Sequence, residues 1–467
     1  MKQYKYVYIL GIGGIGMSAL ARWFNRQGAQ VFGHDMSKSS LTDQLVDEGV
    51  NIHFEVAVDA IPTTILNHPS DTLVVYTPSI STKNPIWQYL VTHGYQVCKR
   101  GDVLSLITRD HYTLAVAGTH GKTTSTSLAA HILCYANENI TAFLGGIAKN
   151  YHTNFIASPN TKKEVSIVIE ADEFDRFFLQ LYPDIAIITT VDPDHLDIYR
   201  DVMGFEEGFR QFLNRLPEQG LAILHRHVAK KLLSAAHPLK TQVVQYALSD
   251  APIYTSNVKI NQTGHFVFDY VSEKVVIKDI ELPVPGYHNI ENALAVVTAC
   301  LHMGVPPEII REAIHTFQGV ARRFDKIIER DDLVFLDDYG HHPVEITALL
   351  TTIRKIYPGK KITVIFRPNQ HSRTQDFLIE IAQSLDLADC VFLLDIYSDR
   401  EAPIEGISSK SILGKMKLAC KHYAASKEDL IAQLAQTDRP EIVVNLGAGD
   451  ADVFIQPIKE FLLKNYP

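Results

Sequence analysis

Residues 117–124 read Ala-Gly-Thr-His-Gly-Lys-Thr-Thr and combine the residue types of a phosphate-binding loop. They follow the apolar run 112–116, which predicts a short buried strand, and precede a helical pattern over 127–135. A glycine-containing turn at a helix N-terminus presents backbone N–H groups and the positive end of the helix dipole to an anion. Lys122 is then placed to reach the outer phosphates, and the Thr123 hydroxyl to hold Mg²⁺. We therefore predict an ATP site formed by Gly118, Thr119, His120, Gly121, Lys122, Thr123 and Thr124.

A second glycine-rich turn lies near the start of the chain. Gly11-x-Gly13-x-x-Gly16 falls between a strand predicted at 6–10 and a helix predicted at 17–27, and Asp35 ends the next strand. Alone, this pattern favours an NAD-dependent oxidoreductase, although a purely structural turn would also explain it. Hydride transfer has no use for a separate ATP loop, so the two turns together indicate a nucleotide-linked substrate and ATP. For a UDP-sugar, the candidate contacts are Gly11, Gly13, Gly14, Ile15, Gly16, Asp35 and Ser79.

Acidic residues follow two further strands predicted in the central part of the chain. The run 165–169 leads into Glu-Ala-Asp-Glu-Phe-Asp at 170–175, and the run 185–191 leads into Asp-Pro-Asp-His-Leu-Asp at 192–197. Ligands bind at the carboxyl ends of parallel strands, and Mg²⁺ prefers carboxylate and phosphate oxygens. Glu173 beside Thr123 is a candidate first metal site. His195 is a candidate ligand of a second divalent cation, or else a structural or surface histidine.

The composition limits the class of protein. The chain has 467 residues, 46% of them hydrophobic and 21% charged, with a net charge of −9. This acidic balance argues against binding to nucleic acid or to an anionic membrane, and no apolar run reaches membrane-spanning length. The five scattered cysteines suit reduced thiols, and fit neither a disulfide framework nor a zinc site. We therefore expect a cytoplasmic enzyme.

Strand and helix patterns alternate along the whole chain and predict an α/β protein of three domains. We place these at 1–108 (Rossmann-like), 109–318 (a P-loop-type ATPase with a parallel sheet and a small β patch) and 319–467 (Rossmann-like). In the first domain, strands are expected at 30–33, 72–76 and 96–98. The β patch is expected within 222–284, before a helix from about 289. In the third, strands are expected at 333–337, 361–366, 391–394 and 441–445.

Three other groups of residues each have a structural and a functional interpretation. His288-Asn289-x-x-Asn292 either caps a helix or reads an adenine base. Arg322-Arg323 is either a solvated pair or a clamp on a transferring phosphoryl group. Asp337 ends a strand, where it could bind a ribose hydroxyl.

Taken together, these motifs resemble the ATP-dependent Mur ligases from residue 6 to residue 449. The shared pieces are GIGGIGMSALA (11–21), AVAGTHGKTT (115–124), EADEFD (170–175), DPDHLD (192–197), HNIEN (288–292), RRFD (322–325), DDYGHHP (337–343) and EAPI (401–404). The resemblance implies three domains that bind a UDP-sugar, ATP and an amino acid in that order. It implies that ATP, UDP-N-acetylmuramate and L-alanine give UDP-N-acetylmuramoyl-L-alanine, ADP and phosphate, in peptidoglycan synthesis. We expect a monomer or weak homodimer.

The resemblance also implies roles for single residues. Lys122 would meet the transferring phosphate, Thr123 and Glu173 one Mg²⁺ (or Mn²⁺), and His195 a second ion. The remaining roles would be adenine contact by His288, Asn289 and Asn292, phosphate contact by Arg323, ribose contact by Asp337, and amino-acid contact by Tyr339, His341 and Arg373.

One segment departs from the family pattern. Where the family often has F-Q-P-H-R-Y-S-R-T, residues 366–374 read Phe-Arg-Pro-Asn-Gln-His-Ser-Arg-Thr. Arg373 is retained as a partner for an α-carboxylate, with Arg367 as a possible substitute for the replaced arginine. Three alternatives stay open: a ligase that attaches a preformed tripeptide to the same UDP-muramate, the oxidoreductase, and a nucleotide-binding regulator without turnover.

Overall fold

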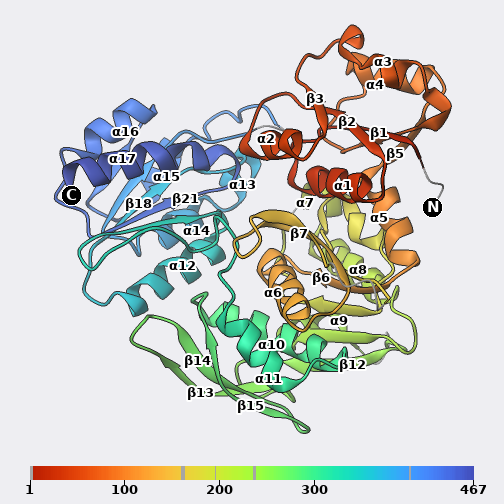
Figure 1. Ribbon diagram of the computed structural model, residues 1–467. Helices are drawn as coiled ribbons and strands as arrows, with labels where there is room; N and C mark the ends of the chain where they lie inside the picture. The colour runs from red at the N-terminus through yellow and green to blue at the C-terminus, as the bar shows by residue number, and fades with distance from the viewer. Residues whose placement is uncertain (1–3, 159–163, 195, 235–237, 399–400) are drawn as a thin grey trace. The chain divides into compact units, whose positions relative to one another are not determined.

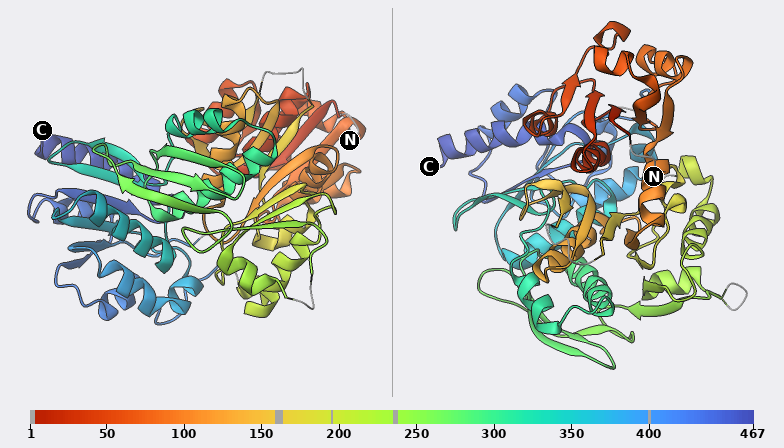
Figure 2. Two further views of the ribbon diagram at one scale, coloured as in Figure 1. Left: turned by 90° about the horizontal axis from the view of Figure 1, so that it is seen from below. Right: turned by 45° about the vertical axis from the view of Figure 1, so that its right-hand side comes forward.

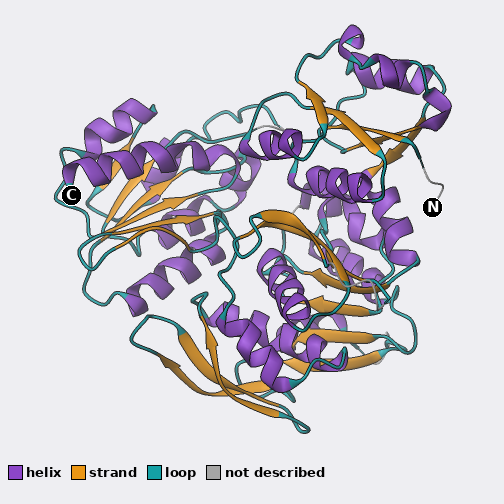
Figure 3. Cartoon of the chain, viewed as in Figure 1, coloured by secondary structure: helices purple, strands orange, loops and turns teal. Residues whose placement is uncertain are grey.

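The computed structural model describes residues 4–158, 164–194, 196–234, 238–398 and 401–467. Helices and strands alternate throughout (Figure 3), which confirms the expected α/β class. The chain divides into two compact units. The first comprises 1–258, 267–282 and 289–318; the second comprises 259–266, 283–288 and 319–467. No helix within the described ranges has both the length and the apolar character needed to cross a membrane.

The N-terminal segment forms a five-stranded parallel sheet in the order β3-β2-β1-β4-β5, with helices on both faces (Figure 1). Val7 and Ile9 pack on the side of α1, whereas Tyr6, Tyr8 and Leu10 pack with residues of α3 and α4. The elements are β1 (Tyr6–Leu10), α1 (Ile15–Arg26), β2 (Gln30–His34), α2 (Ser40–Asp47), β3 (Asn51–His53), α3 (Thr63–Leu66), β4 (Thr72–Tyr76), α4 (Pro85–Thr92), β5 (Gln96–Lys99) and α5 (Arg100–Arg109).

The central sheet has seven strands in the order β12-β11-β10-β6-β9-β7-β8. All pairs are parallel except β7–β8, so the carboxyl ends of β6, β9 and β10 meet at one edge. The elements are β6 (Tyr112–Ala117), α6 (Lys122–Tyr135), β7 (Ile140–Ala148), β8 (Thr153–Ala157), β9 (Ser166–Glu170), η3 (Phe174–Gln180), β10 (Ile185–Ile188), α7 (Leu196–Tyr199), α8 (Val202–Leu213), β11 (Leu221–His225), α9 (Arg226–Leu232) and β12 (Gln242–Tyr246).

One apolar cluster runs through both of these segments, from the α1 face of the first sheet to the buried strands of the second. A polar contact accompanies it: the buried Arg22 guanidinium of α1 donates to Asn154 of β8, and Asn154 donates to the hydroxyl of Ser18 at 2.9 Å. Helix α1, which follows the first glycine-rich turn, is therefore anchored on the central sheet inside one compact unit.

A separate three-stranded sheet, β13-β14-β15, follows the central sheet, and two helices come after it. This is the expected β patch, and the helix expected from about residue 289 begins at Tyr287. The elements are β13 (Tyr254–Ile260), β14 (Phe266–Val271), β15 (Val276–Leu282), α10 (Tyr287–His302) and α11 (Pro307–His315).

The C-terminal segment forms a six-stranded sheet in the order β16-β17-β21-β18-β19-β20, antiparallel only at β16–β17. Figure 2 shows this part of the chain, coloured from teal to blue, from two directions. Val364 packs with residues of α12, α14 and α15, and its neighbour Ile365 packs with residues of α16 and α17, so helices cover both faces. The elements are β16 (Asp325–Glu329), β17 (Val334–Asp338), α12 (Pro343–Ile356), β18 (Ile362–Phe366), α13 (His371–Asp376), α14 (Leu378–Leu385), β19 (Cys390–Leu393), α15 (Ser409–Lys415), β20 (Lys421–Tyr423), α16 (Lys427–Leu434), β21 (Ile442–Leu446), η4 (Gly449–Phe454) and α17 (Ile455–Asn465).

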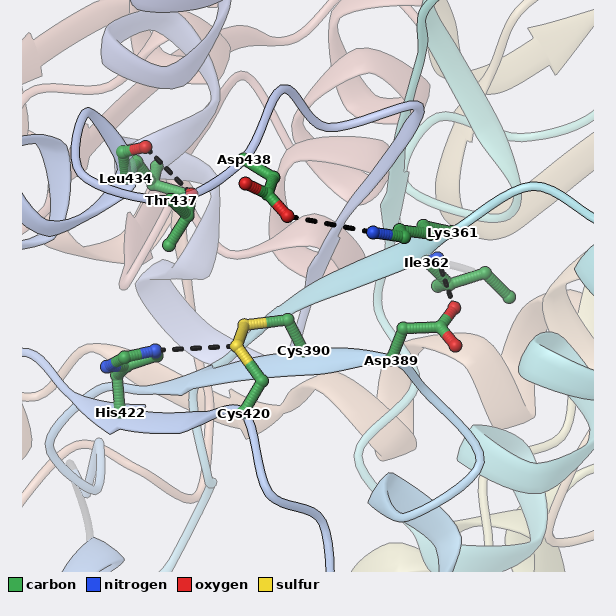
Figure 4. The surroundings of a disulfide bond; sticks show 9 residues. All are labelled: Lys361, Ile362, Asp389, Cys390, Cys420, His422, Leu434, Thr437 and Asp438. Carbon is green, nitrogen blue, oxygen red and sulfur yellow. Dashed lines mark hydrogen bonds and ion pairs between the residues drawn. A yellow bond between two sulfur atoms is a disulfide. The ribbon is translucent and has the colours of Figure 1, made fainter.

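The expectation of five reduced thiols is wrong for two of the cysteines. Cys390 and Cys420 form a disulfide (Figure 4), whereas Cys98, Cys134 and Cys300 are free. Val391 of β19 lies opposite Lys421 of β20, and this parallel register brings the preceding cysteines together across 30 residues of sequence.

Candidate functional site

The phosphate loop follows β6 at the centre of its sheet. Gly118 and Gly121 have φ values of +130° and +81°, in the region that favours glycine. A Cβ on Gly118 would lie 2.2 Å from Thr189 Oγ1, and one on Gly121 would lie 2.6 Å from Asn292 Oδ1. Gly121 is the residue before α6, so the loop ends at the N-terminus of a 14-residue helix. The backbone is thus arranged as anion binding requires.

Lys122, in the first turn of α6, is partly buried and lies against carboxylates. Its Nζ donates to Gly118 O at 2.7 Å and to both Glu173 carboxylate oxygens at 2.8 and 3.0 Å. The Thr123 hydroxyl donates to Glu170 Oε2 at 2.8 Å. Glu170, rather than Glu173, is therefore the carboxylate next to Thr123, while Glu173 pairs with the lysine of the same loop.

The charges of this cluster depend on one another. Burial alone would lower the pKa of Lys122, but the carboxylates of Glu173, Asp172 and Glu170 raise it above its usual value. Burial raises the pKa of Glu173 to about 7, although the Lys122 ammonium opposes that rise. A lysine that stays protonated in a buried setting supplies a fixed positive charge at the phosphate loop.

Some of the other residues predicted for the ATP site lie around this loop. The Thr119 hydroxyl donates to Asp192 O at 2.7 Å, and His120 N donates to Thr190 Oγ1 at 3.0 Å. Thr124 lies in the first turn of α6, and Asn292 Nδ2 donates to Asn289 Oδ1 at 3.2 Å beside Gly121. His288 lies in the first turn of α10. His195 lies outside the described residues.

Hydroxyl and carboxylate oxygens gather beside the loop, and this donor set suits Mg²⁺. Thr123 Oγ1 and Glu170 Oε2 lie 2.8 Å apart, and the Glu173 carboxylate reaches the same loop through Lys122. These residues fit a hard divalent cation, with Glu170 as a further oxygen donor that the sequence reasoning did not assign.

The first glycine-rich turn closes on Asp35. Gly13 N donates to Asp35 Oδ2 at 2.7 Å, Gly11 has a φ of +79°, and Gly14 is the residue before α1. Ile15 and Gly16 form the first turn of that helix. The Ser79 hydroxyl lies 3.1 Å from Thr77 Oγ1, and a Cβ on Gly11 would lie 2.9 Å from Thr77 Cγ2. The loop of residues 77–80 therefore borders this turn.

Sequence reasoning missed a cation beside the same turn. A Cβ on Gly16 would lie 2.4 Å from the Arg100 Nη1 atom, so the guanidinium rests on the first turn of α1. Arg100 also stacks on Phe177, with its Cζ 5.2 Å from the ring centroid. An arginine at a helix N-terminus adds to the attraction for a diphosphate. No motif marks Arg100, because it is 84 residues from Gly16 in the sequence.

In the C-terminal unit, Arg322 and Arg323 have different surroundings. Arg322 donates from Nε to Asp337 Oδ2 at 3.2 Å, from Nη2 to Gly447 O at 2.8 Å and from Nη1 to Gly449 O at 3.0 Å. Arg323 is more exposed, and its Nη1 lies 3.4 Å from Glu345 Oε1. Both guanidinium groups lie over the Tyr339 ring, at 5.1 and 5.3 Å from its centroid.

The residues predicted for the amino acid lie at the carboxyl ends of β17 and β18. His341 Nδ1 lies 3.1 Å from Tyr339 O, and its ring meets the Tyr339 ring edge-on. Arg373 Nη1 donates to Asn369 Oδ1 at 3.2 Å, so one of the residues that depart from the family pattern holds the retained arginine.

Asp337 is fully buried, and Asn445 Nδ2 donates to its Oδ1 at 2.7 Å. Burial raises the pKa of Asp337 to about 6, although Arg322 opposes that rise.

This raised pKa predicts a pH-dependent stability. The folded state holds the proton on Asp337 more tightly than the unfolded state does. The contribution of this proton to the stability of the fold is therefore complete below the unfolded pKa of 3.8 and is lost as pH rises through about 6. The unfolding free energy of the wild type minus that of Asp337→Asn should fall by up to about 3 kcal/mol between about pH 4 and pH 7. Denaturant-induced unfolding of both proteins, monitored by circular dichroism at each pH, measures this difference.

Asp332 offers a matched control. Its hydrogen bond with Arg330 lowers its pKa to about 2, so the wild-type-minus-Asp332→Asn difference in unfolding free energy should rise with pH between about pH 2 and pH 4 and stay nearly constant between pH 4 and pH 7. If the difference in unfolding free energy between the wild type and Asp337→Asn does not change with pH, the raised pKa assigned to Asp337 is wrong.

Comparison with known proteins covers the whole chain. Sequence models match the Mur ligase family, catalytic domain at residues 6–112, the Mur ligase middle domain at 116–300 and the Mur ligase, glutamate ligase domain at 322–449. The chain is 42% identical to the UDP-N-acetylmuramate–L-alanine ligase of Flavobacterium johnsoniae over 466 residues. The aligned region covers 100% of this chain and 99% of that protein. The ligase of the same name from Parabacteroides distasonis is 41% identical, covering 98% of this chain and 97% of the relative.

Two solved structures of ligases also superimpose on nearly the whole chain. The UDP-N-acetylmuramate–alanine ligase of Thermotoga maritima superimposes with a TM-score of 0.82 at 25% identity, over 98% of this chain and 99% of that one. A murein peptide ligase from Psychrobacter arcticus shares the fold, with a TM-score of 0.69 at 21% identity and 98% of each chain covered.

Proposed function

The chain belongs to the Mur ligase family, and on that premise we propose that it is an ATP-dependent ligase that joins L-alanine to UDP-N-acetylmuramate. The products are UDP-N-acetylmuramoyl-L-alanine, ADP and phosphate. The observation that carries the proposal is the phosphate loop with Lys122 paired to Glu173, in a chain about 40% identical throughout to ligases of that name. As a step of peptidoglycan synthesis, the reaction takes place in the cytoplasm, with the enzyme as a monomer or weak homodimer.

The chemistry is phosphoryl transfer followed by acyl transfer. The muramoyl carboxylate attacks the γ-phosphorus of ATP in line, which releases ADP and leaves an acyl phosphate. The alanine amine then attacks the acyl carbon, and phosphate leaves. Two anions meet in the first step, so the fixed charge of Lys122 and that of Arg323 lower its barrier.

Divalent cations support the first step. Thr123, Glu170, Glu173 and His195 are the residues that would hold Mg²⁺ or Mn²⁺, two ions in all, and the ions would neutralise charge on the phosphates. Lys122 stays paired with Glu173 until phosphate oxygens replace the carboxylate as its partners.

The amine must lose a proton before or during the second step. We propose His341, held by Tyr339 O and 3.9 Å from Glu345 Oε2, as the base. Arg373 would meet the α-carboxylate of the amino acid, with Asn369 fixing its guanidinium.

Phosphate release measured with ATP, Mg²⁺ and UDP-N-acetylmuramate, with each amino acid or the stem tripeptide added in turn, tests the function. Release that requires both the UDP-sugar and L-alanine supports it. Release with the tripeptide alone would place the chain among the tripeptide ligases, and ATP binding without release would indicate a regulator. A change in nicotinamide absorbance would indicate an oxidoreductase.

We expect Arg100→Ala to raise the KM for UDP-N-acetylmuramate by about tenfold or more, because charge-assisted contacts contribute about 1.5–3 kcal/mol. The KM for ATP should be unchanged, since Arg100 rests on the first turn of α1 rather than on the ATP loop. Initial rates at varied UDP-sugar concentration measure this. Arg109→Ala, on the same helix, is the matched control, because Arg109 stacks on Tyr182 instead. An equal loss of affinity in both variants would contradict a specific role for Arg100.

A further inference from the structure

Three side chains with soft or borderline donor atoms meet at the edge of the C-terminal sheet (Figure 4). The Sγ atoms of Cys390 and Cys420 and one ring nitrogen of His422 all lie within 4.8 Å of one another. Cys420 precedes β20 and His422 lies two residues later, so both side chains point to the same face of that strand. Cys390, at the start of β19, is opposite Cys420. The parallel register therefore assembles the cluster from distant parts of the sequence.

The position of His422 is fixed by packing. Its ring stacks on Phe392, its partner in the β19–β20 register, with centroids 4.8 Å apart and planes 17° apart. Its Nε2 lies 3.5 Å from Cys420 Sγ. A ring held in this way already directs its nitrogen at the sulfur atoms.

The cluster is also accessible. Strand β20 is an edge strand, and Cys420 and His422 are partly exposed, while Cys390 is buried. It lies at the amino ends of β19 and β20, the opposite end of these parallel strands from the loops that carry Arg373 and Tyr397. Occupation of the cluster therefore leaves the amino-acid residues untouched.

We propose that, when the disulfide is reduced, Cys390, Cys420 and His422 form a binding site for a thiophilic divalent cation such as Zn²⁺. Reduction by a phosphine or a dithiol gives two thiols. The cation then replaces both thiol protons, so one M²⁺ binds to two thiolates and the His422 Nε2 with release of two H⁺. Tetrahedral Zn²⁺ sites place sulfur and nitrogen ligands roughly 3.3–3.8 Å apart, which small side-chain rotations from the present positions achieve. Water fills the fourth position.

The full chain provides the test. It is reduced with a phosphine, desalted without oxygen and titrated with Cd²⁺ in excess Mg²⁺, with thiolate-to-metal charge-transfer absorption as the readout. We expect one equivalent to bind with release of two protons, and no charge-transfer band before reduction. The band should disappear in Cys390→Ser and in Cys420→Ser, and His422→Ala should weaken binding by about tenfold or more. Cys134→Ser is the matched control and should bind as the wild type does.

Other results would overturn the proposal. These are a charge-transfer band in the oxidised protein, a band that survives in Cys420→Ser, or an unchanged affinity in His422→Ala. If a cysteine variant fails to fold, X-ray absorption of the Zn²⁺-loaded wild type decides the question. Two sulfur neighbours and one imidazole support the site, and an all-oxygen or all-nitrogen shell refutes it.

Discussion

Replacing Lys122 with methionine should lower phosphate release by about 10³-fold or more, because removal of a cation from a transferring phosphoryl group has effects of that size. The lysine is the loop cation whose charge is maintained by the nearby carboxylates of Glu173, Asp172 and Glu170, against the effect of burial on its pKa. Binding of UDP-N-acetylmuramate should be unchanged, because its proposed contacts lie at the first glycine-rich turn. Phosphate release and calorimetric titration of the UDP-sugar measure the two effects separately.

A structural explanation has to be separated from this chemical one. Lys122 and Glu173 form a buried ion pair, and removing one partner of such a pair destabilises a fold by about 3–5 kcal/mol. The double variant Lys122→Met/Glu173→Gln has no unpaired buried charge, so it should recover most of the lost stability. It should not recover activity. If the double variant releases phosphate at close to the wild-type rate, Lys122 is structural and the proposed mechanism is wrong.

The phosphate loop shows what local sequence can predict. The apolar run before it, the positions of Gly118 and Gly121 and the helix after it are all local, and the structure confirms this strand–turn–helix order. The choice of carboxylate beside Thr123 is not local. Glu170 ends β9 opposite Val116, whereas Glu173 comes just before a turn in which Asp175 and Arg176 have φ values of 54° and 55°. Counting residues along the acidic segment could not have shown which one faces the hydroxyl.

The contacts that sequence reasoning missed depend on the order of strands in the sheets. Arg100 reaches Gly16 because α5 packs in the same apolar cluster as α1, against one face of the sheet. Cys390 meets Cys420 because β19 and β20 are neighbours in register. Neither pairing leaves a local pattern in the sequence.

The two adjacent arginines at 322 and 323 should behave in opposite ways. Arg323→Lys should fold normally, yet lower kcat by about 10²-fold or more, because a lysine keeps the charge but loses the planar group that we propose spans two phosphate oxygens. Arg322→Lys should mainly lower stability, because the Arg322 guanidinium donates to Asp337, Gly447 O and Gly449 O and so ties its own turn to β17 and to the turn after β21. Phosphate release and thermal unfolding, measured on both variants, separate the two roles.

Their backbone explains why neighbours differ so much. Arg322 and Phe324 have φ values of 62° and 46°, and Arg323 lies between them, so the chain turns sharply at each residue. Phe324 N donates to Asp338 Oδ2 at 2.7 Å, which fixes the turn from the side of β17. The Arg322 side chain is thereby directed at Asp337 and Gly447, whereas the Arg323 side chain lies beside Tyr339 and Glu345 with more access to solvent. If Arg323→Lys proves as unstable as Arg322→Lys, or retains full activity, then Arg323 belongs to the same structural network and does not contact the phosphates.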